Sequence, residues 1–166
     1  MIEAIENFFL ETVGKEWCVF ICSMLPVIEL RGAIPLGINV LKLPVWETYI
    51  LSVLGNMVPV PLMLLFITKL IDVMSRSKIK FFNKIGAALT KKADKNREKI
   101  LRYSFWGVAL FIAIPLPATG AWTGSLVAAT VGMKFWKAML SSFIGVLLAG
   151  LIVTLISGGF ALIFQS

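Results

Sequence analysis

Residues 26–37 read PVIELRGAIPLG and place an acid and a base inside a long apolar run. Glu29 and Arg31 are the only charged residues between positions 17 and 41. A charge at the bilayer centre costs at least about 2.5–3.5 kcal/mol, so such residues usually face a partner or a wet cavity. The prolines and glycines of the stretch interrupt a regular helix. The pattern predicts a broken helix that carries an intramembrane ion pair.

The composition places the chain in a membrane. Of the 166 residues, 58% are hydrophobic and only 15% are charged, which leaves too little polar surface for a water-soluble globule. The absence of histidine excludes catalytic triads and metalloprotease helices. Cys18 and Cys22 lie one helical turn apart, and we expect them to be packing residues rather than a disulfide or a metal site. No nucleotide loop or nucleophile elbow occurs, so we expect no enzyme activity and no cofactor.

The positive charge of the chain is concentrated in one segment. Ten of the sixteen Lys and Arg residues lie between Arg76 and Arg102. This clustering argues against nucleic-acid binding and is typical of a cytoplasmic loop. Ile79, Phe82 and Ile85 recur at helical spacing there, so the segment is either a surface helix on anionic lipid or a solvated loop.

A second helix break lies in the uncharged block 103–133. With 31 residues this block is long for one span, which needs about 20, and short for two. Pro115, Pro117 and Gly120 interrupt its middle, so we expect two half-length helices that enter and leave on the same side. Irregular backbone at membrane depth is tolerated only where it is buried in protein or lines a wet cavity. Two such re-entrant hairpins predict a polar site between them.

The two halves of the chain show the same order of blocks. Pro115 lies 89 positions after Pro26, and an offset of 90 aligns three further pairs: Trp46 with Trp136, Ser52 with Ser142, and Gly55 with Gly145. With the basic segment in the cytoplasm, the halves have opposite orientation, as in many secondary transporters.

The expected fold class is therefore an all-α integral membrane protein with an inverted repeat of re-entrant hairpin plus transmembrane helix, preceded by an interfacial amphipathic helix. A plain four-helix membrane bundle is the alternative. The single membrane domain divides into an amphipathic helix (1–16), a first re-entrant hairpin (17–46), a transmembrane helix (47–74), a cytoplasmic basic segment (75–102), a second re-entrant hairpin (103–133) and a second transmembrane helix (138–164).

The candidate site combines the two hairpin tips. Arg31 suits a phosphate or carboxylate, and Glu29 suits a proton-coupling acid or a group that holds Arg31; a purely structural ion pair is the alternative. The second tip offers hydroxyls and helix N-termini, although its glycines equally suit close helix packing. The predicted substrate-binding and transport residues are Glu29, Arg31, Pro35, Pro115, Pro117, Thr119, Gly120, Thr123 and Gly124.

Residues 26–37, together with residues 114–124 (IPLPATGAWTG), resemble the prokaryotic small multidrug export family over nearly the whole chain. That family is distantly similar to the DedA superfamily, whose members have two re-entrant hairpins in an inverted repeat. By this likeness Glu29 matches the acid of the first hairpin and Pro115 the proline of the second. The uncharged stretch 103–133 departs from DedA proteins, which carry arginines around the second proline. The resemblance implies a multi-pass protein of the prokaryotic inner or plasma membrane.

We therefore expect a small, homo-oligomeric membrane transporter whose partners are membrane lipids and a small-molecule substrate. The substrate is expected to be amphipathic or anionic, such as a polyisoprenyl lipid phosphate, and its transport proton-coupled. Efflux of cationic drugs is one alternative, and a non-transporting scaffold or assembly factor is another.

Overall fold

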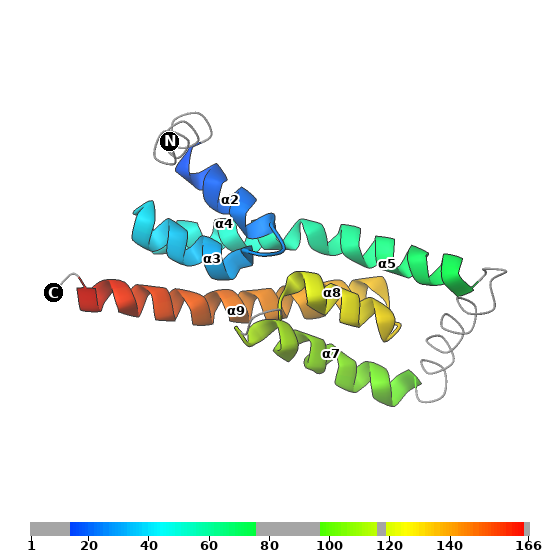
Figure 1. Cartoon of the computed structure of the whole chain (residues 1–166). Helices are drawn as coiled ribbons and strands as arrows, with labels where there is room; N and C mark the ends of the chain where they lie inside the picture. Colours follow the sequence, from blue (N-terminus) through cyan, green and yellow to red (C-terminus); the bar gives the residue numbers. More distant parts are fainter. Residues whose placement is uncertain (1–13, 76–96, 116–118, 165–166) are drawn as a thin grey trace. The chain divides into compact units, whose positions relative to one another are not determined.

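The computed structural model describes residues 14–75, 97–115 and 119–164, and every element within these ranges is a helix. The all-α prediction is thereby confirmed. Most of the predicted amphipathic helix 1–16 and most of the basic segment lie outside the described residues. The elements are α2 (Lys15–Met24), α3 (Glu29–Pro35), the π-helix η1 (Leu36–Val40), α4 (Val45–Met57), α5 (Pro59–Ser75), α7 (Arg97–Ala113), α8 (Ala121–Thr130) and α9 (Phe135–Phe164) (Figure 1).

Two stretches are long and apolar enough to cross a bilayer, Val45–Ile71 and Phe135–Gly158. They coincide with the two predicted transmembrane helices. The first stretch is broken between α4 and α5 because Pro59 has no N–H to donate, and the Val58 N–H instead donates to the Gly55 carbonyl at 3.2 Å. Pro59 therefore marks a kink within this span.

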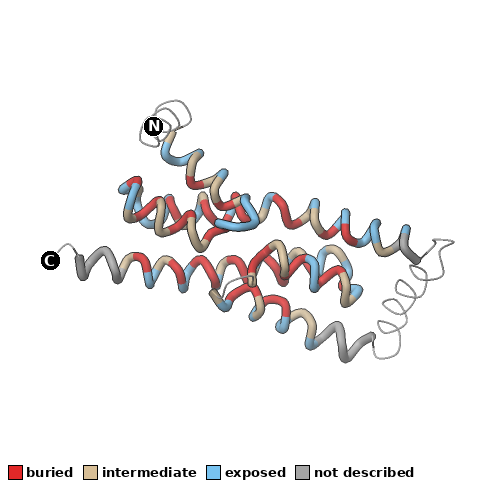
Figure 2. The backbone as a smooth tube through the Cα atoms, viewed as in Figure 1, coloured by how far each residue is buried: buried red, intermediate tan, exposed pale blue. Residues whose placement is uncertain are grey.

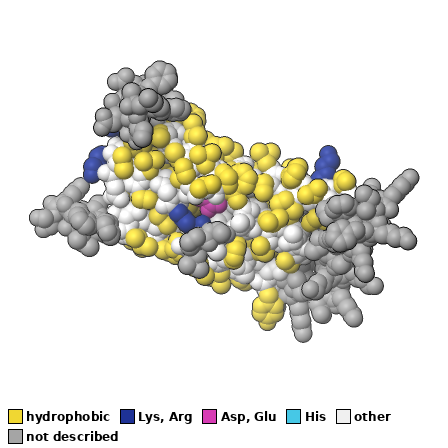
Figure 3. Space-filling view, in the orientation of Figure 1, with side chains coloured by type: hydrophobic (Ala, Val, Ile, Leu, Met, Phe, Trp, Pro, Cys, Tyr) yellow, Lys and Arg dark blue, Asp and Glu magenta, His cyan; other side chains and the backbone are white. Residues whose placement is uncertain are grey.

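Large apolar side chains cover much of the face in Figure 3. On α5, for example, Leu62, Leu65 and Phe66 are each more than half exposed, and on α9 Leu155 is 68% exposed. Figure 2 shows the exposed and buried positions alternating along each helix. An outward apolar stripe beside an inward packed one is expected of helices in lipid, and the chain is a membrane protein.

The chain folds as two compact units, and unit 1 comprises residues 1–58 and 146–166. Within it α2 packs against α3 and α4, and α3 packs against α4. Gly55 lets α2 and α4 approach closely, because any side chain there would collide with the Phe20 carbonyl and the Ser23 hydroxyl. The second part of α9 is fixed to α4 where the Tyr49 hydroxyl donates to the Leu147 carbonyl at 3.1 Å.

Unit 2 comprises residues 59–145, with α5, α7, α8 and the first part of α9. Here α8 packs against both α5 and α7. Gly145 lets α9 approach α7, because a Cβ at this position would lie 2.7 Å from the Ala109 carbonyl oxygen. The Ser141 hydroxyl, on the same helix, donates to the Phe105 carbonyl at 2.6 Å.

The two units share local features at nearly constant spacing. Gly145 follows Gly55 by 90 positions, and the carbonyls that they approach, on Phe20 and Ala109, are 89 apart. The residues that turn the chain into α4 and α9 are also 90 apart, and both adopt a positive φ: 55° at Lys42 and 76° at Gly132. Exposed tryptophans recur likewise at 17 and 106, and at 46 and 136.

Candidate functional site

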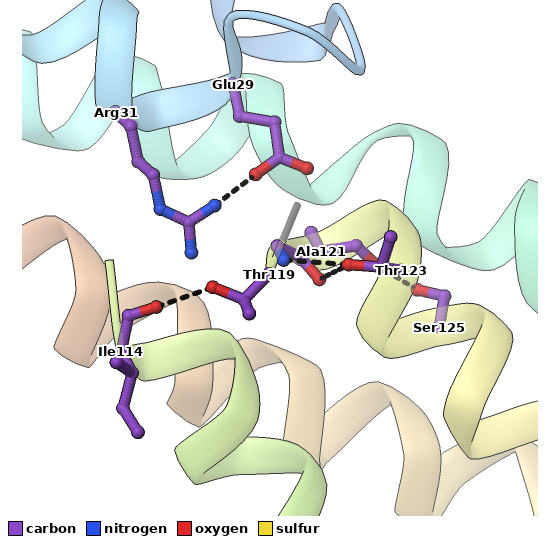
Figure 4. Close-up of polar contacts among 8 residues, drawn as sticks. Glu29, Arg31, Ile114, Thr119, Ala121, Thr123 and Ser125 are labelled. Atoms are coloured by element: carbon purple, nitrogen blue, oxygen red, sulfur yellow. Dashed lines mark hydrogen bonds and ion pairs between the residues drawn. The ribbon is translucent and has the colours of Figure 1, made fainter. Parts of the chain in front are cut away.

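The predicted acid and base form an ion pair in unit 1 (Figure 4). The Arg31 Nη1 donates to the Glu29 Oε2 at 3.1 Å. Two residues apart on a regular helix, the side chains would point to opposite sides. They meet at the start of α3, where the first residue, Glu29, has a φ of 48°, in the left-handed region that residues other than glycine rarely adopt. A backbone so placed stores about 1–3 kcal/mol and is typical of functional sites.

The pair is unequally buried. Glu29 is the one buried charged residue among the side chains that the structure describes. Its side chain is 7% exposed, whereas that of Arg31 is 20% exposed. The guanidinium is therefore the more accessible end of the pair.

Pro35 does not interrupt the helical backbone, although the sequence pattern predicts that the prolines of this stretch do so. It is the last residue of α3, and the chain continues as a π-helix in which the Leu41 N–H donates to the Leu36 carbonyl at 3.0 Å. A π-turn holds one more residue than an α-turn, and such turns are frequent at functional sites. Pro35 therefore marks a change of helix type at the end of the segment that carries the ion pair.

The predicted residues of the second tip lie in unit 2 and hold their own turn together. The Thr119 hydroxyl donates to the Ile114 carbonyl at 2.7 Å, and the Gly120 N–H donates to the Thr123 hydroxyl at 2.9 Å (Figure 4). These bonds close the loop and cap the start of α8. Gly124 packs against Ile112 so closely that a side chain would collide with it, which favours the packing interpretation of this glycine.

The second tip also contains Pro115 and Pro117. Pro115 follows the end of α7 and is half-buried, whereas Pro117 lies outside the described residues.

Sequence reasoning missed a set of buried polar residues on α4. Thr48, Ser52 and Asn56 are at most 1% exposed, and their side-chain oxygen and nitrogen atoms have no hydrogen-bond partner. The available signal was their spacing of four residues, which puts them on one face of a helix. Cys18 and Cys22 are free thiols on α2 that pack against a cluster of Val19, Ala33 and Leu41.

A family model described as "Putative small multi-drug export protein" matches residues 29–152. The match begins at the acid of the ion pair and extends through the second turn into α9. No curated protein and no solved structure matches the chain. Because the match covers most of the chain, this protein belongs to the small multi-drug export family, as the resemblance of its two motifs implied.

Proposed function

We propose that this protein transports an amphipathic anion, such as a polyisoprenyl lipid phosphate, by means of the Glu29–Arg31 pair. The observation that carries the proposal is a buried acid on strained backbone, bonded to a more accessible guanidinium. A buried ion pair contributes little to stability, because the free-energy cost of removing both charges from water often exceeds their mutual attraction. Its retention inside a membrane segment favours a role in transport.

Helix length supports re-entrant hairpins. α2 and α8 have 10 residues each, about 15 Å at 1.5 Å per residue, against a hydrocarbon core of about 30 Å. The apolar part of α7, Tyr103–Ala113, is of similar length. Helices of half the membrane thickness, joined by short turns to packed neighbours, suit segments that enter and leave on one side.

The shared spacing supports an inverted repeat. Close glycine contacts, positive-φ residues and exposed tryptophans recur 89 or 90 positions apart. A cytoplasmic basic segment between the two halves gives them opposite orientation. Transporters built this way place their substrate site near the midplane.

The chemistry of the pair suggests how an anion is bound and released. With Glu29 ionised, its carboxylate occupies the Arg31 guanidinium. Protonation of Glu29 neutralises that acceptor, and the guanidinium becomes available for a phosphate or carboxylate, which it can bind with two parallel hydrogen bonds. Loss of the proton restores the pair and expels the anion, which couples substrate movement to protons.

Transport into proteoliposomes tests this proposal, with a polyisoprenyl phosphate as substrate. We expect Glu29→Gln and Arg31→Ala each to abolish uptake driven by a proton gradient. Glu47→Gln and Lys134→Ala, at exposed positions, are the matched controls and should keep the wild-type rate. Wild-type rates in both ion-pair variants would overturn the proposal.

The description of the family names drug export without the charge of the drug, and efflux of cationic drugs is the second candidate. In this case Glu29 itself would bind the cation, and Arg31 would compete for it. Drug resistance of cells should then be lost in Glu29→Gln and kept in Arg31→Ala. An anion transporter loses activity in both variants, so the pair of substitutions separates the two functions.

A further inference from the structure

The polar residues Thr48, Ser52 and Asn56 form a file along one face of α4. They occur at intervals of four residues, and the first two are fully buried while Asn56 is 1% exposed. At 1.5 Å per residue the file is about 12 Å long. It extends from near the start of α4 to its last turn.

Several hydroxyls that the structure describes in helices bond to their own backbone, whereas the file resembles Ser142 and Thr154 of α9, whose hydroxyls are likewise buried without a partner. Ser23, Thr68 and Ser125 each donate to a backbone carbonyl of the preceding turn, at 2.6–2.7 Å. By contrast, Thr48 Oγ1, Ser52 Oγ and both polar atoms of Asn56 are buried without a partner. An amide has two donors and an acceptor, so no rotation of its own side chain satisfies it. Buried polar atoms of this kind normally bind water.

The face that carries the file is turned toward α2, α3 and η1. A Cβ at Gly37 of η1 would overlap the Thr48 side chain, which places the first member beside η1. Gly55, next to Asn56, contacts Ser23 near the end of α2. The turn after α2 leads directly to Glu29, and α3 packs against α4. The file therefore follows these helices toward the turn that precedes the buried acid.

Helix α9 provides an internal comparison. Ninety positions later, α9 carries Ala138, Ser142 and Val146, all fully buried. Only the central member is polar there. Apolar side chains thus pack at the matching end positions of α9. The polar residues at both ends of the file belong to α4, in the unit that contains the buried ion pair.

We propose that Thr48, Ser52 and Asn56 line a file of water molecules along which protons reach Glu29. Each hydroxyl accepts one hydrogen bond and donates another, so it passes a proton to the next water without a net change. The Asn56 amide orients water and does not itself exchange charge. One proton enters from the membrane surface and ends on the Glu29 carboxylate, which becomes a neutral acid. This inference rests on the proposed proton-coupled transport.

The other titratable groups on the packed elements do not replace Glu29 as the acceptor. On α2, Lys15 and Glu16 are exposed, and Cys18 and Cys22 pack in an apolar cluster. On α3, Arg31 is the partner of Glu29. On α4, Glu47 is exposed and the Tyr49 hydroxyl is bonded to Leu147; α9 has no charged residue after Lys137.

Cysteine labelling tests for water independently of transport. Thr48→Cys, Ser52→Cys and Asn56→Cys are made in a background with Cys18→Ala and Cys22→Ala, and are treated with a small charged methanethiosulfonate. Only the thiolate form of cysteine reacts, and apolar surroundings suppress the ionisation of the thiol. We expect these positions to react at least about tenfold faster than Ala138→Cys and Val146→Cys, their counterparts on α9. Equal rates in the two sets would overturn the proposal.

Transport measurements separate this proposal from the proposed function. Thr48→Val and Asn56→Val introduce apolar side chains like those that α9 carries at the matching positions 138 and 146, so the variants should fold. We expect gradient-driven uptake to fall about tenfold, equivalent to about 1.4 kcal/mol in the barrier. Exchange of substrate at low pH, with Glu29 already protonated, should be unchanged, as should uptake by the control Ser142→Ala. Wild-type uptake in Glu29→Gln would refute proton-coupled transport itself. If Glu29→Gln is inactive while Thr48→Val and Asn56→Val keep the wild-type uptake, the water file alone is refuted.

Discussion

Gly55→Ala tests the close contact between α2 and α4. The new methyl group would collide with the Phe20 carbonyl, which belongs to backbone and cannot rotate away, and with the Ser23 hydroxyl. Overpacking of this kind costs about 1–3 kcal/mol, and the better helix propensity of alanine offsets about 1 kcal/mol of it. We expect a net loss of up to about 2 kcal/mol. Gly107→Ala is the matched control, because nothing lies within 4 Å of a Cβ there and only the gain in propensity remains.

Thermal unfolding of the purified protein in detergent measures the difference. The two variants share the gain in helix propensity, so they should differ by the overpacking cost of about 1–3 kcal/mol, or roughly 2–12 °C in Tm for a chain of this size. Gly145→Ala should behave like Gly55→Ala, because its Cβ would meet the Ala109 carbonyl in the same way. A Gly55→Ala protein that melts at or above the Tm of Gly107→Ala would show that the helices do not approach as described.

Three further substitutions can be compared in the same melting assay. Tyr49→Phe removes the hydrogen bond to Leu147 and should cost about 0.5–1.5 kcal/mol, whereas Tyr103→Phe, at a 79% exposed residue, should be neutral. Thr123→Ala removes the bond that caps α8 and should lower stability by about 0.5–2 kcal/mol; if Thr123→Ser does not recover most of this, the cap is not the cause. Lys42→Gly should raise the Tm slightly and Lys42→Val should lower it, because φ is 55° there; the opposite order would contradict the left-handed backbone.

The helix breaks were predictable because their causes are local. Proline lacks a donor and restricts the residue before it, so the interruptions near Pro59 and Pro115 follow from the sequence alone. The ends of the apolar blocks likewise located the two long spans to within a few residues. Pro35 shows the limit of the same rule, because the chain widens into a π-turn there and stays helical.

The contact within the ion pair needed information that spacing does not contain. Glu29 and Arg31 meet beside a single left-handed residue, Glu29 itself, and the sequence does not predict this backbone because glutamate seldom adopts it. The polar file on α4 was hidden for another reason. Serine, threonine and asparagine occur in many membrane helices, where most bond to their own backbone, so only the packed structure distinguishes those that do not.

A comparison of the two units supports the proposal that the ion pair serves transport. In unit 2 a short turn between packed helices is closed by neutral groups, chiefly the hydroxyls of Thr119 and Thr123. A comparable turn in unit 1 places Glu29 on strained backbone and buries a charge, both of which oppose folding. The packing glycines at 55 and 145 serve both units alike, so the fold depends on features that the units share. The buried ion pair and the complete polar file occur only in unit 1 among the described residues, and their cost to stability supports the proposal that they serve transport.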